Sequence, residues 1–247
     1  MGIQNLLPFL SKYARKVSFN DLWGKVCGID VFGWLYKGAY SRAYELVIGE
    51  TTTKHIEYVV RCVEQLIALQ IKPALVFDGI TPDMKLPEEN RRRESRAKSR
   101  ENALKSMNEG NIRRGAALMK REISIDHKSV ISLVKVCIEK GYDYVVAPYE
   151  SDAQLTCTYL QKIGLVDYIL SKDSDLLVFG SSEFTKVIFK INFDSLDGEL
   201  IVLKAIQINF INSLKMFRYM CVLSGCDYLP SIRGIGLNSA FAAINFN

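Results

Sequence analysis

Residues 73–79 read PALVFDG, an apolar run of strand length that ends in Asp78 and Gly79. Such continuous apolar runs are typical of strands buried on both faces of a parallel sheet. The same pattern recurs in three other stretches, KVCGID (25–30), YDYVVAP (142–148) and VDYILS (166–171). The 247 residues, 49% of them hydrophobic, are enough for one large domain built on these strands.

Helical patterns lie between the expected strands. Residues 54–70 place their apolar side chains on one helical face, and residues 127–141 form an amphipathic pattern that closes at Gly141. A third helix is expected over 150–164. Strands that alternate with helices predict an α/β fold with a mostly parallel central sheet and helices on both faces. Two further apolar segments flank SLDG (195–198), which predicts a hairpin with Asp197 and Gly198 at its turn.

Each of the four apolar strands ends in carboxylates. The acidic side chains at or just beyond the strand ends are Asp30, Asp78, Glu150 with Asp152, and Asp173 with Asp175. The carboxyl edge of an open α/β sheet is where ligands bind. One such Asp is usually a helix cap or turn former, but four strands make coincidence a poor explanation. Carboxylates that converge repel one another unless protons or cations lie between them. Their all-oxygen chemistry favours Mg²⁺ or Mn²⁺.

The composition excludes several other chemistries. The chain has two histidines, far apart in sequence, which supply a zinc hydrolase or a Ser/His triad poorly. Its six cysteines form no C-x-x-C pair and are expected to be reduced core thiols. The sequence contains no run of eighteen apolar residues, so we expect no membrane span.

The segment that follows PALVFDG is strongly basic. Between Lys85 and Arg121 there are twelve basic and five acidic residues, a net charge of +7 against +5 for the whole chain. From Glu88 to Asn102 the single apolar residue is Ala97, so a helix here has almost nothing to bury. The pattern indicates either a polyanion contact or a charged helix that merely faces solvent.

Near the C-terminus, CVLSGCDYLPSIRGIGLNSA (221–240) contains one more acidic residue, Asp227. An amphipathic helix precedes it, and the sequence GIG opens another. A helix, a glycine-bearing turn and a second helix can hold a DNA phosphate with backbone N–H groups.

Six segments together resemble the flap-endonuclease and xeroderma-group-G family of structure-specific 5′ nucleases. They are MGIQNLL, GIDVFGWLYKGAY, LVFDG, APYESDAQL, DSDLLVFG and RYMCVLSGCDYLPSIRGIGL. Within that family, WLYKGAY and RYMCVLSGCDYL are more similar to the exonuclease branch than to flap endonuclease. The resemblance covers essentially the whole chain and implies the PIN-like 5′-nuclease fold. It implies one nuclease domain over 1–247, with an N-terminal region (1–99), a helical arch insert (84–122), an internal region (138–230) and a helix–two-turn–helix motif (215–247).

The resemblance implies a two-metal phosphodiesterase with two Mg²⁺ ions per site, for which Mn²⁺ can substitute. The implied metal ligands are Asp30, Asp78, Glu150, Asp152, Asp173, Asp175 and Asp227. Lys85 and Arg92, at the start of the arch, match the residues that reach the scissile phosphate, and with Asp173 they form the expected catalytic set.

The resemblance also implies DNA contacts. The implied set is Gly2, Phe32, Tyr36, Arg91, Arg93, Arg96, Arg233, Gly234 and Gly236. The family commonly has Tyr at the position of Phe32, and its exonuclease branch often has His at the position of Tyr36, so stacking is retained but the polar roles differ. The family's motif binds a monovalent cation such as K⁺ through backbone oxygens, here those of Ser224, Ser231 and Ile235.

The expected function is a metal-dependent 5′→3′ double-stranded DNA exonuclease with 5′-flap endonuclease activity, acting in DNA repair (mismatch repair and end resection). We expect a nuclear monomer that binds DNA and reaches mismatch-repair and replication proteins through a tail beyond this chain. Flap endonuclease proper and a non-catalytic structure-specific DNA-binding module remain alternatives. A haloacid-dehalogenase-type phosphatase requires Asp two positions after its nucleophile, and Asp30 is instead followed by Val31 and Phe32.

Overall fold

The computed structural model describes residues 2–40, 43, 52–149, 151–180, 182–211, 213–229 and 231–245. Over these residues the strands form one seven-stranded sheet in the order β1-β7-β6-β5-β2-β3-β4. The strands are β1 (Arg15–Ser18), β2 (Val26–Asp30), β3 (Lys72–Phe77), β4 (Asp143–Val146), β5 (Tyr168–Leu170), β6 (Lys186–Asn192) and β7 (Asp197–Val202).

The sheet is mostly parallel, as the sequence predicts. Neighbouring pairs from β6 through β5, β2 and β3 to β4 all run parallel, and these include the four predicted strands. The predicted hairpin is formed by β6 and β7. Its turn was placed wrongly, however: residues 193–196 make the turn, while Asp197 and Gly198 already belong to β7. Leu196, with φ of 52°, supplies the left-handed residue that the hairpin needs, so Gly198 was not required for the turn.

Strand β1 was not predicted. Its four residues, RKVS, contain one buried side chain, Val17, and three that are at least partly exposed. A charged strand of this length carries no periodic signal strong enough to separate it from a loop. It pairs antiparallel with β7 at the edge of the sheet, so tertiary pairing rather than hydrophobicity defines it.

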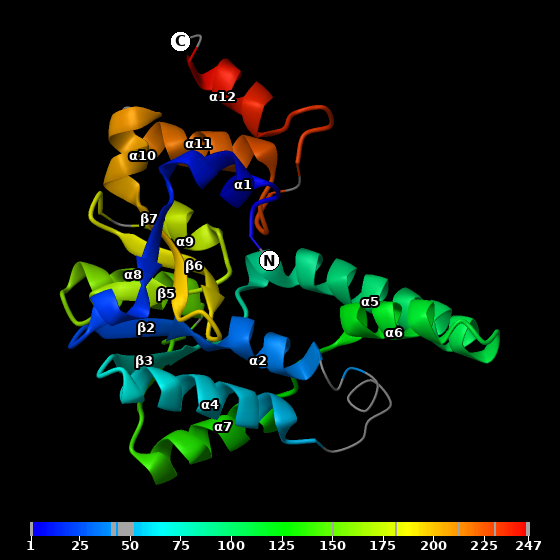
Figure 1. Cartoon of the computed structure of the whole chain (residues 1–247). Coiled ribbons are helices and arrows are strands. Elements are labelled where there is room, and N and C mark those ends of the chain that lie inside the picture. Colours follow the sequence, from blue (N-terminus) through cyan, green and yellow to red (C-terminus); the bar gives the residue numbers. More distant parts are fainter. Residues whose placement is uncertain are drawn as a thin grey trace.

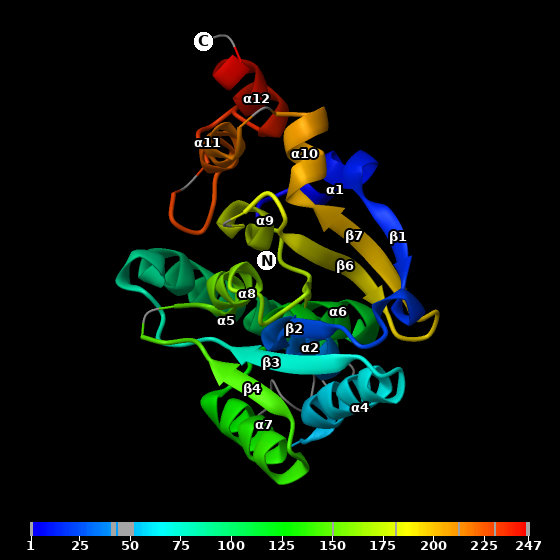
Figure 2. The same ribbon diagram turned by 90° about the vertical axis from the view of Figure 1, so that its left-hand side faces the viewer.

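Helices cover both faces of the sheet (Figures 1 and 2). In Figure 2, α4 (Lys54–Ala68) and α7 (His127–Lys140) lie on one side of β2 and β3, and α8 (Ala153–Lys162) lies on the other. The remaining helices outside the arch are α1 (Leu6–Leu10), α2 (Val31–Ala39), α9 (Asp175–Phe179), α10 (Leu203–Asn209), α11 (Leu214–Ser224) and α12 (Leu237–Asn245). Three short 3₁₀ turns complete the described elements, at Ser11–Tyr13, Phe19–Leu22 and Asp83–Lys85.

Each face of the sheet has its own apolar core. One core joins α8, α9 and the α10–α12 layer to the sheet through residues such as Val76 and Ile169. The other joins α2, α4 and α7 to the opposite face through residues such as Leu75 and Phe77. Val76 and Phe77 are neighbours on β3 and belong to different cores, because successive strand residues point to opposite faces. The continuous apolar runs in the sequence therefore report a sheet that is covered on both sides.

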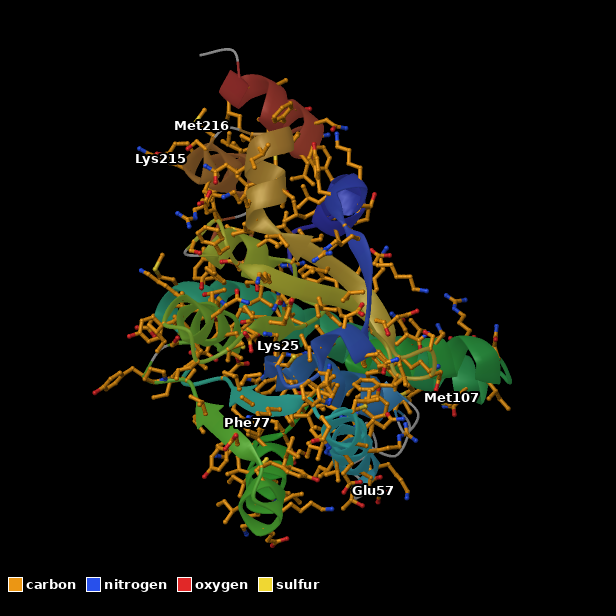
Figure 3. All side chains as sticks on the ribbon, turned by 60° about the vertical axis from the view of Figure 1, so that its left-hand side comes forward. Lys25, Glu57, Phe77, Met107, Lys215 and Met216 are labelled. Carbon is orange, nitrogen blue, oxygen red and sulfur yellow. The ribbon has the colours of Figure 1, made fainter. Side chains whose placement is uncertain are left out.

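The arch consists of α5 (Leu86–Asn108) and α6 (Ile112–Glu122), which pack side by side and project from the sheet (Figure 1). Residues 86–102 contain no buried side chain, as expected. The C-terminal part of α5 does bury side chains, because Ala103 packs with Met119 and Ile123 against Ala39 at the end of α2. Met107 lies at the far end of the arch, whereas Phe77 lies inside the main body (Figure 3).

Residues near the helix ends agree with the sequence pattern. Gly141 and Gly164 adopt left-handed φ angles of 70° and 80° just past α7 and α8. Asp126 and Asp152 accept N–H hydrogen bonds at the first turns of the same two helices. Among the described residues, no helix is both long and apolar enough to cross a membrane.

Candidate active site

The acidic side chains converge at the carboxyl edge of the parallel strands. Asp30 is the last residue of β2, Asp78 directly follows β3, and Asp173 lies three residues past the end of β5. Because β2 is hydrogen-bonded to both β3 and β5, these three strand ends are neighbours. Asp78 and Asp173 each raise the pKa of Asp30, after burial itself, which is the electrostatic signature of carboxylates brought close together.

Asp30 is the most deeply buried of these carboxylates, with 1% of its surface exposed. Its Oδ2 accepts hydrogen bonds from Ser171 Oγ (2.8 Å) and from Gln154 Nε2 (3.3 Å). Its Oδ1 is buried without a hydrogen-bond partner among the described residues. Burial, opposed by the Ser171 bond, raises the pKa of Asp30 to about 7. A buried carboxylate oxygen with no donor is costly unless a proton or a cation reaches it.

Asp173 and Asp175 form a second acidic pair, where the chain enters α9. The backbone N–H of Asp175 donates to Asp173 Oδ1 (3.1 Å), and the N–H of Asp173 donates to Ser171 Oγ (3.0 Å). Burial and then the neighbouring Asp173 raise the pKa of Asp175 to about 7. Asp175 Oδ1 is also buried without a partner in the part of the chain that the structure describes.

Asp78 and Asp152 meet at the start of α8. The N–H of Ala153, the first residue of that helix, donates to Asp78 Oδ1 (2.8 Å). Asp152 caps the helix through Oδ1, which accepts from the N–H of Leu155 (2.9 Å), so its Oδ2 remains available for another contact. The structure thus places six of the seven predicted acidic residues, and Glu150 lies outside the described residues.

Lys85 and Arg92 reach from the arch to this acidic group. Lys85 Nζ lies 2.6 Å from Asp152 Oδ2, and 4.9 Å from the centre of the Tyr228 ring. Burial acts to lower the pKa of Lys85, but the Asp152 carboxylate outweighs it and the pKa is raised. Arg92 Nη2 lies 2.6 Å from Asp227 Oδ1. Two cations from the arch therefore face the acidic group, in position to meet an anion bound between them.

The donor set fits a divalent cation. The side chains are carboxylates, and those of Asp30 and Asp175 each have a buried oxygen with no hydrogen-bond partner among the described residues. Burial and repulsion from neighbouring carboxylates raise the pKa values of both. A hard cation with oxygen ligands would satisfy those oxygens and remove the repulsion. Within the described ranges, no three His, Cys, Asp or Glu side chains lie in an arrangement that could hold a metal ion without movement.

Gly2 lies against the acidic pair, next to Asp173 and Ser174. A Cβ atom at Gly2 would lie 2.6 Å from Asp173 Oδ1 and would also meet Ser174 Oγ. Its φ of +87° is in the left-handed region that favours glycine. The N-terminal segment is therefore part of the site, and only glycine fits at this position.

The other predicted DNA contacts are spread over α2 and the arch. Phe32 and Tyr36 are both half-buried on α2, and after burial Arg96 is the strongest influence on the Tyr36 hydroxyl. Arg91 makes two hydrogen bonds, both 2.7 Å long, with Glu88 and is mostly exposed. Arg93 is exposed. Of these residues, Tyr36 and Arg96 are brought close to each other, where α2 faces the arch.

The predicted phosphate-binding turn lies between α11 and α12. Arg233, Gly234 and Gly236 are exposed there, and Gly234 has a left-handed φ of 84°. Of the expected cation-binding residues, Ser231 lies against Gly225, the residue after Ser224, and the N–H of Ile235 donates to Ile232 (2.9 Å). Ser224 is thus the last residue of α11, and Ser231 and Ile235 lie in the turn that follows it.

Sequence reasoning missed three residues of the site. Ser171 and Gln154 bind Asp30, and the ring of Tyr228 lies against Lys85. All three stand next to, or two residues from, an acidic residue of the predicted set. That proximity was the available signal, but sequence alone does not tell which neighbours of a ligand point toward it.

Two family models match separate parts of the chain. The XPG N-terminal domain matches residues 1–99, and the XPG I-region matches residues 141–227. Together they contain every acidic residue of the site, and the first match extends into α5 of the arch. The chain belongs to the XPG family.

Relatives in the XPG family include proteins named Exonuclease 1. The chain is 38% identical to that of Xenopus laevis over 246 residues, 97% of this chain and 32% of the relative. It is 36% identical to that of Drosophila melanogaster over 247 residues, 97% of this chain and 33% of the relative. The chain thus spans about a third of the length of these relatives. These similarities confirm the prediction that the chain is similar to the exonuclease branch of the XPG family.

The fold is also that of a solved structure. The catalytic core of Rad2 in complex with a DNA substrate superposes with a TM-score of 0.77 at 22% identity, covering 99% of this chain and 68% of that chain. The predicted fold class is therefore confirmed by comparison as well as by the observed sheet.

Proposed function

We propose that the chain is the nuclease part of a metal-dependent 5′→3′ double-stranded DNA exonuclease with 5′-flap endonuclease activity. The observation that carries the proposal is the pairing of two features at one edge of the sheet. Buried carboxylates with unpartnered oxygens, Asp30 and Asp175, belong to the same acidic group as Asp152 and Asp227. Lys85 pairs with Asp152, and Arg92 pairs with Asp227. A phosphodiester needs both: cations around its oxygens and ligands that hold metal ions. Similarity to the Exonuclease 1 proteins supports the choice of DNA ends as substrate.

The acidic residues Asp30, Asp78, Asp152, Asp173, Asp175 and Asp227, with Glu150, would hold two divalent cations, Mg²⁺ or Mn²⁺. When bound, such ions acidify water and neutralise charge on the transferring phosphate. No histidine base is then needed, which agrees with the absence of both histidines from this edge of the sheet: His55 lies on α4 and His127 on α7.

The protein's own residues hold and orient the substrate. Lys85 and Arg92 donate to the oxygens of the scissile phosphate, where negative charge increases during hydrolysis. To do so they must leave Asp152 and Asp227, with which they form ion pairs of 2.6 Å. Gln154 and Ser171 orient Asp30 through its Oδ2 and leave Oδ1 directed toward its ligand. Arg96 and Arg233, with the glycines of the last turn, steer and hold the duplex backbone.

The proposal has further parts beyond the activity. We propose that the protein acts in the nucleus, in mismatch repair and end resection. We propose that it works as a monomer and binds mismatch-repair and replication proteins. K⁺ would bind the turn between α11 and α12 through the backbone of Ser224, Ser231 and Ile235.

A nuclease assay tests the proposal. A duplex with a recessed 5′ end, labelled at either terminus, is incubated with the protein and Mg²⁺, with EDTA, or with the variant Asp173→Asn. We expect stepwise shortening from the 5′ end in Mg²⁺, release of a flap as one fragment from a flapped substrate, and no cleavage in the other two reactions. Cleavage that persists in EDTA or in Asp173→Asn would contradict the assignment.

A further inference from the structure

Two cations flank one aromatic ring on the side of α2 that carries Gly33 and Lys37, and a third cation lies against Gly33 on that side. Lys37 Nζ lies 5.7 Å from the centre of the Tyr58 ring, and the Arg61 guanidinium carbon lies 5.3 Å from it. Lys172, in the loop after β5, runs along Gly33: its Cβ, Cγ and Cδ atoms lie 3.9 Å from the position that a Gly33 Cβ would occupy. Helix α2, helix α4 and the β5–α9 loop thus contribute one cation each.

The electrostatic surroundings of the buried Cys62 thiol indicate that the three cations lie near one another. Burial raises the pKa of Cys62, on α4 one residue after Arg61, while Arg61, Lys37 and Lys172 all act to lower it. Arg61 and Lys172 are exposed, and Lys37 is half-buried. One surface patch, which we call the Tyr58 cluster, therefore consists of Lys37, Tyr58, Arg61 and Lys172.

The cluster has no acidic partner within the described part of the chain. None of its three cations forms an ion pair there. Asp194 acts on the cluster by raising the pKa of the Tyr58 hydroxyl. Like charges placed together repel, and two of these are held by cation–π contacts instead of carboxylates. Such contacts fix the side chains and leave their charge free for an external anion.

The cluster lies next to the active site but not beneath the arch. Lys172 directly precedes Asp173, and Gly33 is three residues past Asp30. Tyr36, one residue before Lys37, is instead influenced by Arg96 and Arg92, so that side of α2 faces the arch. In Figures 1 and 2, α2 lies between the arch and α4. Helix α2 thus separates two sets of cations, one on the arch and one in the Tyr58 cluster.

The width of α2 decides which strand the cluster can reach. A helix with its side chains is about 10–12 Å across, close to the roughly 12 Å width of the DNA major groove, which is bounded by phosphates of opposite strands. If one strand is held between Lys85 and Arg92, the phosphates on the other side of α2 belong to its complement. This step rests on the proposed function, because it assumes that the arch side receives the strand that is cut.

We propose that the Tyr58 cluster binds backbone phosphates of the DNA strand that is not cut. Lys37 and Lys172 donate to phosphate oxygens as point charges, and Arg61 donates through its planar guanidinium. The contacts read no bases, so they fix the position of the duplex relative to the carboxylates without sequence preference.

Binding measurements with neutralised side chains test the proposal. The variants Lys37→Gln, Arg61→Gln and Lys172→Gln are compared with Lys162→Gln, which removes an exposed lysine at the end of α8. The dissociation constant of a recessed duplex is measured in Ca²⁺ from low to high salt, and thermal unfolding checks that each variant folds. We expect each cluster variant to reduce the slope of log K against log salt by about 0.9, with the slope of Lys162→Gln equal to that of the unmodified protein.

Duplexes with single neutral methylphosphonate linkages then identify the strand. A linkage in the uncut strand near the cut should weaken binding to the unmodified protein. It should have little further effect on a variant that combines Lys37→Gln, Arg61→Gln and Lys172→Gln, because the same contact is already lost. The proposal would be overturned if the cluster substitutions were coupled to linkages in the cut strand instead. It would also be overturned if the cluster variants had the same salt slope as Lys162→Gln. Failure of the proposed function looks different: the unmodified protein would then bind the duplex without cleaving it in Mg²⁺.

Discussion

At the scale of single residues, Gly2 and Asp173 show how closely the backbone and the acidic group fit together. Gly2 belongs to the N-terminal segment and Asp173 to the loop after β5, yet a single added methyl group at Gly2 would overlap the Asp173 carboxylate. The site therefore depends on a backbone conformation as well as on its charged side chains.

The variant Gly2→Ala should reduce cleavage by about tenfold to a hundredfold, because displacing a catalytic group by around 1 Å can cost that much. Gly24→Ala is the matched control: Gly24 also has a positive φ, +71°, but nothing lies within 4 Å of its added Cβ. Single-turnover rates and melting temperatures of both variants separate the two effects. Equal loss of rate in both would show that backbone strain, and not contact with Asp173, is responsible.

Substitutions of Arg92 and of Arg100 should change different quantities, the rate of cleavage and the affinity for DNA. Arg92 is partly buried and reaches Asp227, whereas Arg100 is exposed on the same helix, two turns further from the site. We expect Arg92→Ala to lower the single-turnover rate at saturating enzyme by about 10²–10³, as for other groups that stabilise transition-state charge. Arg100→Ala should instead change affinity and its salt slope by about one phosphate contact. Equal loss of rate in the two variants would mean that the arch acts as one undivided electrostatic lid.

At the scale of elements, the turn between α11 and α12 contains glycines of two kinds. A Cβ at Gly225, whose φ is +100°, would lie 2.8 Å from both Cα and N of Ser231. Gly236 has no atom within 4 Å of an added Cβ and no left-handed φ. The fold of the turn thus requires glycine at position 225. At Gly236, by contrast, there is open space next to the start of α12.

Gly236→Leu should therefore weaken duplex binding without lowering the melting temperature, because the added side chain occupies space that a phosphate would approach. Gly225→Leu should lower both. Dissociation constants for duplexes of unrelated sequence should change by the same factor in Gly236→Leu. A strongly sequence-dependent change would argue that the turn reads bases, contrary to the proposed backbone contact.

At the scale of the whole molecule, the two faces of the sheet are stabilised by separate cores, and a buried histidine lies in the layer of α2 and α4. His55 is 2% exposed, and neither ring nitrogen has a hydrogen-bond partner among the described residues. Its backbone lies against Gly38 of α2. Burial lowers the pKa of His55, opposed by Asp126, so the fold favours the neutral ring.

This histidine makes stability depend on pH. Because the pKa is lower in the folded state, the unfolded chain binds a proton more readily, and the stability present above pH 6.5 is lost as pH falls below it. The free energy of unfolding should fall by up to about 1.4 kcal/mol per pH unit from this one group. Urea unfolding between pH 5 and 8 measures it. His55→Leu should flatten the dependence relative to the exposed control His127→Gln, and an unchanged slope in His55→Leu would exclude His55 as the cause.

The parts of the fold and site that could be predicted are those encoded by local pattern. Apolar runs such as 73–77 marked the parallel strands, because burial on both faces needs apolar residues at every position. Strand β1 and the position of the hairpin turn were not predicted, because pairing partners and left-handed residues such as Leu196 define them. Ser171 and Gln154 were missed because their roles depend on where Asp30 lies in space.

The sequence by itself determined the class of the fold, the edge of the sheet where the carboxylates gather and the charged character of the arch. Each of these follows from the order and spacing of residue types along the chain. Only the tertiary structure decided which oxygens of Asp30 and Asp175 remain without partners and that Gly2 lies against Asp173. It also decided that Lys37 and Arg61 flank Tyr58, with Lys172 against Gly33 nearby. The physical reason is that burial, repulsion and hydrogen bonding depend on distances between atoms, and here those atoms come from segments far apart in the chain.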